Sequence, residues 1–300
     1  MKTPLQLLKA VYNRLDYYLC PDKIFLNRKF KKVFGRDINW KNPVTFNEKL
    51  QWLKVYDRKP LYTQLVDKYE VRKYITEKIG EEYLIPLLGI WNRFDDINFN
   101  ELPKQFVLKC THDSASVVIC KDKSTFDIEA ARKKLSASLR RNFYYSNREW
   151  PYKHVRPRII AEKLMLTADG DLPKDYKFMC FEGEPRLLFL DIGVCEAENL
   201  GGHAEEYYRN IYDMNFQPVD MIETRDHYQI ESIMQPKTFT LMKQIARTLS
   251  SGLHHCRVDL YDIDGQVYFG EITFYHGSGY NFFRPASWDE ELGSWIVEDV

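Results

Sequence analysis

The sequence predicts an α+β fold in which helices and antiparallel sheets form mixed α/β lobes. Short apolar runs come in pairs separated by polar or glycine-containing turns, and helical segments stand in blocks between these pairs. The 300 residues are 44% hydrophobic and 29% charged, which is the composition of an ordinary globular protein. A chain of this length fits interlocked lobes. We expect a helical region over 1–82, a central lobe over 83–165 and a C-terminal lobe over 166–300.

The charge balance argues against a nucleic-acid partner. Lys and Arg total 43, as do Asp and Glu, so the formal net charge is zero and no broad basic surface is expected. The first twenty residues interrupt their apolar positions with Lys, Arg and Asp and lack a small-residue cleavage site. They therefore resemble neither a signal peptide nor a membrane span, and we expect a cytoplasmic protein without a transmembrane segment.

Cysteine usage points to a reducing compartment. None of the six cysteines stands in a CxxC pair, and several lie in apolar strand-like runs, so we expect buried free thiols. The six positions are 20, 110, 120, 180, 195 and 256.

Helices are predicted for much of the first 80 residues. Residues 1–35 have helical spacing of apolar side chains. Thr45 and Glu48 stand three positions apart, as a capping box requires, and predict a helix over about 46–56. A further helix is expected over about 61–79.

Strands dominate from residue 83 onward, with two intervening helices. The helices are expected over about 127–142 and 236–251. The expected strands are 83–91, 105–110, 117–120, 158–165, 175–181, 185–191, 255–261 and 266–273, the last two joined by a turn at 262–265.

The C-terminal hairpin is the sharpest chemical feature. A tight turn lets Asp259 and Glu271 approach each other on one sheet face, and Gly270 is consistent with a bulge there. Paired carboxylates raise each other's pKa unless a cation lies between them, and Mg²⁺ prefers such oxygen ligands together with phosphates and water. The alternative is that both acids face solvent.

Two other segments suggest nucleotide contacts. Lys109 lies in an apolar strand before the hydroxyl-containing loop 111–116, whose backbone N–H groups can meet phosphate oxygens. The alternative is a polar turn beside a lysine whose amine reaches water. The segment 159–165 can line an adenine, although an ordinary edge strand has the same pattern.

In this order the pieces resemble the ATP-grasp superfamily, and in particular the TupA-like ATP-grasp family of bacterial surface-polysaccharide clusters. The resemblance extends from about Asn42 to Ile296. It rests on NPVTFNEKLQWLK, DKYEVRKYI, LPKQFVLKCTHDS, REWPYKHVRPRIIAEKLM, DYKFMCFEGEP, RVDLYDIDGQVYFGEITFYHGSG and FRPASWDEELGSWI, of which RVDLY…FGEITF is the most specific.

The resemblance implies a fold that holds ATP between two antiparallel-sheet lobes, with Mg²⁺ as a second cofactor. Asp259 and Glu271 would be the metal ligands, and Arg257 and Lys177 would act on the charge of the reacting groups. The nucleotide contacts would be Lys109, His112, Ser114, Ser116, Glu162, Lys163, Leu164, Met165, Asp175 and Lys177. Two departures stand out: loop 111–116 lacks glycine, and Thr273 stands where many ATP-grasp ligases carry Asn.

The activity implied is a carboxylate–amine ligase that forms an amide through an acyl phosphate. Its partners would be ATP, a sugar-acid or saccharide acceptor of a capsular or other surface polysaccharide, and an amino acid or other amine. Peripheral contact with a membrane-associated polysaccharide assembly would fit the same setting.

Two alternatives remain open. A glycosyltransferase could use the Asp-x-Asp strings at 169–171 and 262–264 to hold a metal, although Asp and Gly also suit turns. A sugar kinase could use the same ATP site.

Overall fold

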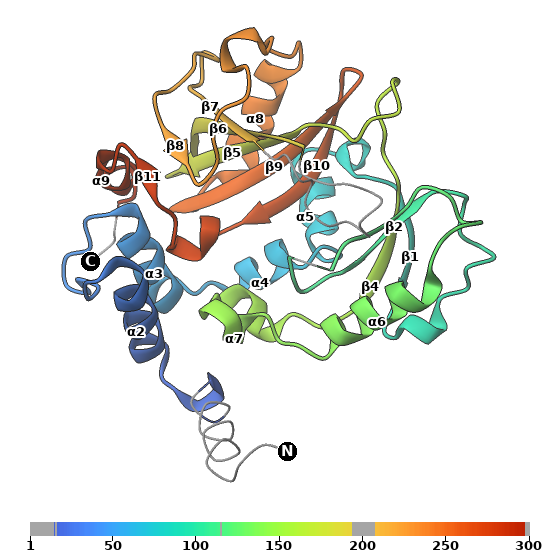
Figure 1. Ribbon diagram of the computed structural model, residues 1–300, viewed down its shortest axis with the longest axis horizontal. Helices are drawn as coiled ribbons and strands as arrows, with labels where there is room; N and C mark the ends of the chain where they lie inside the picture. The colour runs from blue at the N-terminus through green and yellow to red at the C-terminus, as the bar shows by residue number, and fades with distance from the viewer. Residues whose placement is uncertain (1–14, 16, 115, 194–207, 298–300) are drawn as a thin grey trace.

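The computed structural model describes residues 15, 17–114, 116–193 and 208–297. Helices combine with antiparallel sheets, which confirms the predicted α+β class (Figure 1). A four-stranded sheet has the order β1-β4-β2-β3, a five-stranded sheet has the order β10-β9-β5-β6-β7, and β8 pairs with β11. The helices α4 and α5 lie between the two larger sheets (Figure 1).

Capping residues end helix α2 and begin helix α3. Helix α2 (Asp22–Phe34) stops at Gly35, which has a left-handed φ of 74°. Helix α3 (Phe46–Tyr56) starts at a complete capping box, in which the Thr45 hydroxyl accepts from the Glu48 N–H and the Glu48 carboxylate returns to the Thr45 N–H. The predicted bounds of this helix are confirmed.

The single helix predicted over 61–79 is wrong. The chain forms two helices, α4 (Pro60–Val66) and α5 (Val71–Lys78). Between them the Asp67 carboxylate accepts hydrogen bonds from the N–H groups of Tyr69 and Glu70, which turns the chain. Arg158, far along the sequence, pairs with the same carboxylate at 2.8 Å.

The four-stranded sheet carries a core on one face and polar side chains on the other. Its strands are β1 (Leu87–Trp91), β4 (Ile159–Lys163), β2 (Phe106–Cys110) and β3 (Val118–Cys120). Leu108 and Ala161 pack with Leu135 of α6 (Ile128–Leu139) in the core of this lobe. Lys109 and Glu162 alternate with these residues and occupy the opposite face. The start of the expected strand 83–91 is instead a 3₁₀ turn, η1 (Glu81–Tyr83).

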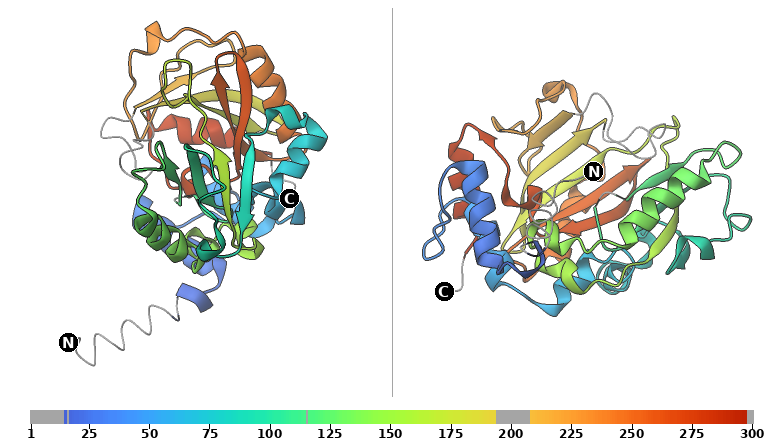
Figure 2. Two further views of the ribbon diagram at one scale, coloured as in Figure 1. Left: turned by 90° about the vertical axis from the view of Figure 1, so that its right-hand side faces the viewer. Right: turned by 60° about the horizontal axis from the view of Figure 1, so that its bottom comes forward.

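The five-stranded sheet has the same two-faced character. Its strands are β5 (Asp175–Phe181), β6 (Glu184–Ile192), β7 (Tyr208–Tyr212), β9 (His255–Ile263) and β10 (Gln266–Thr273). Phe178, Leu188 and Val258 join Met242 and Leu249 of α8 (Phe239–Ser250) in a large core. Figure 2 shows α8 on the outer side of this sheet. The hairpin of β9 and β10 was predicted correctly, whereas β7 was not predicted.

The remaining elements are short. They are η2 (Phe94–Asp96), α7 (Tyr144–Asn147), η3 (Trp150–His154), β8 (Ile222–Glu223), η5 (Ile230–Ser232), η6 (His276–Gly279), β11 (Phe283–Arg284) and α9 (Ser287–Ser294). No helix within the described ranges has the length and apolarity needed to span a membrane.

The prediction of buried free thiols is confirmed for four of the six cysteines, whereas a fifth is free but not buried. Cys110, Cys120, Cys180 and Cys256 are buried free thiols, and Cys20 is a partly exposed one. Cys195 lies outside the described residues.

Candidate active site

The acidic hairpin brings its two carboxylates onto one face. Glu271 of β10 pairs directly with Asp259 of β9. The register shifts between Phe269 and Glu271, so Gly270 lies at an irregularity, as the sequence suggested. A Cβ at Gly270 would lie 3.0 Å from the Asp259 carbonyl oxygen, so a side chain there would crowd the hairpin. Asp259 is 1% exposed, which excludes the solvent-facing alternative for this residue.

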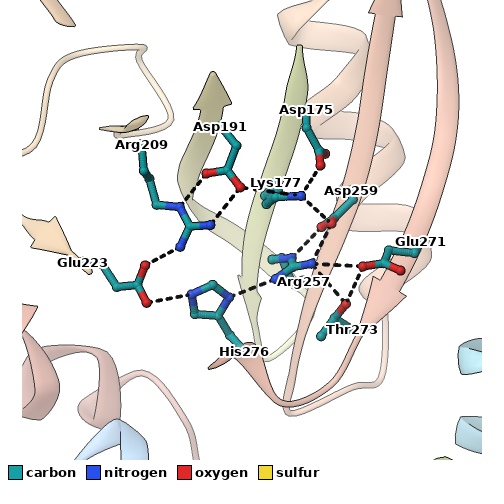
Figure 3. A network of polar contacts seen from close by, with 10 residues as sticks. All are labelled: Asp175, Lys177, Asp191, Arg209, Glu223, Arg257, Asp259, Glu271, Thr273 and His276. Carbon is teal, nitrogen blue, oxygen red and sulfur yellow. Dashed lines mark hydrogen bonds and ion pairs between the residues drawn. The ribbon is translucent and has the colours of Figure 1, made fainter. Parts of the chain in front are cut away.

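Two cations lie against these carboxylates (Figure 3). Arg257 donates from Nε to Asp259 Oδ1 and from Nη2 to Asp259 Oδ2, both at 2.7 Å. The same Nη2 lies 3.1 Å from Glu271 Oε1 and 3.3 Å from the Thr273 hydroxyl. Lys177 of β5 reaches Asp259 Oδ2 at 3.0 Å and also pairs with Asp175. The guanidinium and the ammonium therefore separate three acids that would otherwise repel each other.

Electrostatics follow from this arrangement. Burial would raise the pKa of Asp259, but Arg257 and Lys177 outweigh it and hold that pKa below its ordinary value. For Asp175 burial dominates, and the pKa of this carboxyl rises to about 6. Its Oδ1 atom is buried and has no hydrogen-bond partner among the described residues. An unsatisfied buried oxygen next to charged groups is a position where a ligand can be bound.

The network continues across all five strands (Figure 3). Arg209 of β7 donates from Nη2 to Asp191 of β6 at 2.8 Å and also pairs with Glu223. Glu223 lies 3.4 Å from Nε2 of His276, and the other ring nitrogen of His276 accepts from Arg257 at 3.1 Å. The network therefore joins the acidic hairpin to β7 on the far edge of the sheet.

The donor set fits a magnesium ion. The network in Figure 3 contains five carboxylates and three cationic side chains, an excess of two negative charges. Two carboxylates from the protein suit Mg²⁺ when phosphates and water complete its shell. No group of three or more metal-binding side chains is found in the part of the chain that the structure describes. Asp259 and Glu271 are the two carboxylates that the hairpin brings together on one face.

The four-stranded sheet faces this network with its own ion pair. Lys109 Nζ lies 2.6 Å from Glu162 Oε2, and Arg72 approaches the other oxygen of Glu162 at 3.6 Å. Burial raises the pKa of Tyr261 on β9, and the carboxylates of Asp175 and Glu162 add to this shift.

In the loop after Lys109, several polar side chains are buried and hydrogen-bonded to the protein. His112 is 2% exposed, and its Nε2 lies 3.1 Å from the carbonyl oxygens of Ser138 and Arg141. The Ser116 hydroxyl accepts from the Cys110 N–H at 2.8 Å and donates to Asp113. Ser114 is exposed. The predicted nucleotide contacts of His112 and Ser116 therefore depend on backbone groups, because their side chains already bind the protein.

The segment predicted to meet adenine leaves its backbone available. Strand β4 ends at Lys163, whose side chain is exposed and whose N–H donates to Pro86 at 3.0 Å. Within the described chain, Leu164 and Met165 have no hydrogen bond from their backbone groups. Leu164 is buried and Met165 is half-buried, so apolar surface accompanies these free groups.

Several residues of the site escaped prediction from the sequence. Lys68 donates to the Asp113 carbonyl and so lies on the loop predicted to contact phosphate. Its position three residues before the helical VRKYI segment gave no signal of a role in the site. Asp191, Arg209 and Glu223 were also missed. Asp191 is a charge at the end of an apolar strand, which is the signal that could have found it.

The TupA-like ATPgrasp family matches residues 48–297. The D-alanine–D-alanine ligase of Bacillus anthracis has 17% identity and a TM-score of 0.40, with 70% of this chain and 57% of that chain covered. The L-amino acid ligase of Bacillus licheniformis has 15% identity and a TM-score of 0.45, with 85% and 55% covered. This chain thus spans a little over half the length of either ligase. No curated protein matches it.

The two antiparallel sheets, with the acidic hairpin in one of them, form a fold of the ATP-grasp class. Within that class, this chain belongs to the TupA-like ATPgrasp family.

Proposed function

We propose that this protein is a Mg-ATP-dependent carboxylate–amine ligase. The observation that carries the proposal is the pair of Asp259, which is buried, and Glu271, which is half-buried; they face each other across the hairpin with Arg257 bonded to both. Family membership supports the same reaction class. The predicted division at residues 82 and 165 is part of the proposal, with the nucleotide held between the central and C-terminal lobes.

In the reaction, a carboxylate oxygen of the acceptor attacks the γ-phosphorus of ATP, and ADP leaves. The amine nitrogen then attacks the carbonyl carbon of the acyl phosphate, phosphate departs, and the nitrogen loses a proton to give the amide. The protein needs no nucleophile of its own, because positioning and charge neutralisation supply most of the rate.

The side chains divide this work. Lys109 and Lys177 neutralise phosphate oxygens, and Arg257 stabilises the charge that develops on the acyl phosphate. Bound by Asp259 and Glu271, Mg²⁺ would neutralise further phosphate charge. The free backbone of Leu164 and Met165 would bind the adenine edge beside Glu162 and Lys163, and Asp175 would meet the ribose with its unpartnered oxygen. Loop 111–116, with His112, Ser114 and Ser116, would cover the phosphates.

The substrate class proposed is a sugar acid of a capsular or other surface polysaccharide, joined to an amino acid or another amine. It rests on the family resemblance alone. A cytoplasmic location with peripheral contact to a membrane-associated assembly belongs to the same proposal.

The ligase fits better than a glycosyltransferase. Asp262 accepts hydrogen bonds from the Thr238 hydroxyl and from the Gly265 N–H, which is a turn-forming role. The N–H of Asp171 and its carbonyl oxygen bind Thr167 in another exposed turn. Both Asp-x-Asp strings therefore serve their own turns.

The test is release of ADP and phosphate from Mg-ATP in the presence of D-glucuronate or D-galacturonate and a panel of amino acids. Release that requires both the carboxylate and the amine is expected. The double variant Asp259→Asn, Glu271→Gln should abolish it. A stable phosphorylated sugar formed without amine would instead establish a kinase, and unchanged release by the double variant would overturn the assigned metal ligands.

A further inference from the structure

A row of buried polar side chains on α3 binds the segment that follows the acidic hairpin. Asn47, Gln51 and Lys54 are each 0% exposed. Their spacing of four and three residues places them on one face of the helix. We call these three residues the α3 row. Such residues on a helix ordinarily face water, so complete burial requires compensating partners.

The partners are backbone groups of the turn after β10. Gln51 Nε2 donates to the carbonyl oxygens of Ser278 at 3.0 Å and Gly279 at 2.8 Å. Lys54 Nζ donates to the same Ser278 oxygen at 2.8 Å and to Gln51 Oε1 at 2.9 Å. Asn47 Nδ2 donates to the Asn281 carbonyl oxygen at 2.9 Å, and Asn47 Oδ1 accepts from the Asn281 N–H at 3.1 Å.

The turn needs this support because its backbone is unusual. Gly277, Ser278 and Gly279 have φ values of 54°, 56° and 67°, a run of left-handed residues. Ser278 has a Cβ and therefore pays a steric cost that glycine avoids. A Cβ at Gly279 would lie 2.4 Å from Gln51 Nε2, so the close approach of helix and turn depends on this glycine.

The turn carries His276, which binds Arg257. Arginine can only donate hydrogen bonds, so Nδ1 of His276 must be the acceptor in the 3.1 Å contact with Arg257 Nη1. The ring proton is then on Nε2, which lies 3.4 Å from Glu223 Oε1. His276 is 2% exposed, and only the neutral ring satisfies this geometry.

His276 differs from the carboxylate partners of Arg257. Asp259 and Glu271 are the proposed metal ligands, so a cation would compete with Arg257 for their oxygens. The neutral imidazole lies outside that ligand pair and holds the guanidinium independently of it.

We propose that the α3 row consists of positioning residues that hold the turn 276–281 so that His276 fixes the guanidinium of Arg257. The N-terminal helix thereby completes the site of the five-stranded sheet. The role of Arg257 in this proposal rests on the proposed function. The placement of the turn does not, and it can be tested by itself.

The first test measures hydrogen–deuterium exchange in the full-length protein without ligands. Lys54→Met should raise exchange at the amides of Ser278, Tyr280 and Asn281 at least about tenfold. Lys49→Met is the matched control, because Lys49 lies on the same helix and donates to a different carbonyl, that of Ile296, at 2.7 Å. If Lys54→Met does not fold, Gln51→Leu takes its place. Unchanged exchange at the turn, or an equal rise throughout the protein, would overturn the proposal.

The second test follows phosphate release from Mg-ATP with D-glucuronate and glycine. Lys54→Met should lower kcat about tenfold and leave KM for ATP within about twofold. His276→Asn, whose amide oxygen can replace Nδ1 as acceptor, should retain more kcat than His276→Leu. Equal kcat for these two variants would refute the role of His276. If the wild type fails to turn over these probes, the proposed substrates are wrong, and the exchange experiment alone decides the role of the α3 row.

Discussion

The two faces of the five-stranded sheet are buried to similar degrees by opposite means. On the outer face, Phe178, Val258 and Leu260 are 0% exposed within an apolar core. On the inner face, Asp259 is 1% exposed and Lys177 is 7% exposed, yet both are charged. The outer face is stabilised by removal of apolar area from water. The inner face is stable only because each charge has an opposite charge or a hydrogen bond beside it.

The two faces should respond differently to substitution. Apolar packing tolerates modest changes in shape, whereas a buried ion network is sensitive to the loss of a single charge. Residues that alternate along one strand, such as Val258 and Asp259, therefore have separable roles. Substitutions on the outer face should change stability alone, and those on the inner face should change the chemistry of the site as well.

The largest effect is expected for Asp259→Asn. Loss of this carboxylate leaves Arg257 and Lys177 with one negative partner fewer in a buried site. We expect a loss of about 3–5 kcal/mol in the free energy of unfolding, measured by urea denaturation. Phosphate release should fall by at least about 10²-fold, as for loss of a preorganised electrostatic contact. Asp264→Asn is the matched control, because Asp264 is exposed in the same hairpin with a φ of 52°, which Asn also tolerates. Equal stability of the two variants would show that the inner network contributes little.

The hairpin could be predicted from the sequence because its signals are local. The turn at 262–265 and the apolar alternation around it fix the register, and the capping box at Thr45 and Glu48 fixes the start of α3 in the same way. The break between α4 and α5 was missed: Asp67 turns the chain locally through the N–H groups of Tyr69 and Glu70, but its second partner, Arg158, lies 91 positions away.

Asp191, Arg209 and Glu223 of the inner network, and the burial of the α3 row, were missed for a related reason. Asn47, Gln51 and Lys54 have the pattern of a solvated helix face, and only the turn at 276–281 shows that they are buried. Arg209 joins the site through β7, a strand with mixed polarity. Sequence patterns report which side chains share a face, but they do not report which distant backbone covers it.

A smaller effect on the free energy of unfolding is expected from a change of pH. It involves the uncharged His255, at the start of β9 on the inner face. His255 is buried between Phe46 and Phe181, and its Nδ1–H donates to the Cys180 carbonyl oxygen at 2.8 Å. Burial, with smaller contributions from the nearby His276 and Arg257, lowers the pKa of this imidazole from 6.5 to about 3.

Because the unfolded chain binds this proton more readily, stability should fall as the pH drops from about 6.5 towards 3. One such group contributes a slope of at most about 1.4 kcal/mol per pH unit. His255→Asn, which can keep the donor to Cys180, should flatten the slope of unfolding free energy between pH 6 and pH 4. An unchanged slope in urea titrations would show that His255 is not the group responsible.

The smallest effect sharpens the contrast between adjacent residues of β10. Ile272 is 2% exposed in the outer core, whereas the Glu271 carboxyl beside it is 35% exposed on the inner face. Ile272→Val removes one methylene and should cost about 0.5–1.5 kcal/mol of unfolding free energy. It should leave the Mg²⁺ concentration for half-maximal phosphate release unchanged. Glu271→Gln should raise the Mg²⁺ concentration for half-maximal phosphate release. It should cost little stability, because an exposed ion pair contributes at most about 1 kcal/mol. If both variants shifted the Mg²⁺ requirement equally, the two faces of the sheet would not have separate roles at Glu271 and Ile272.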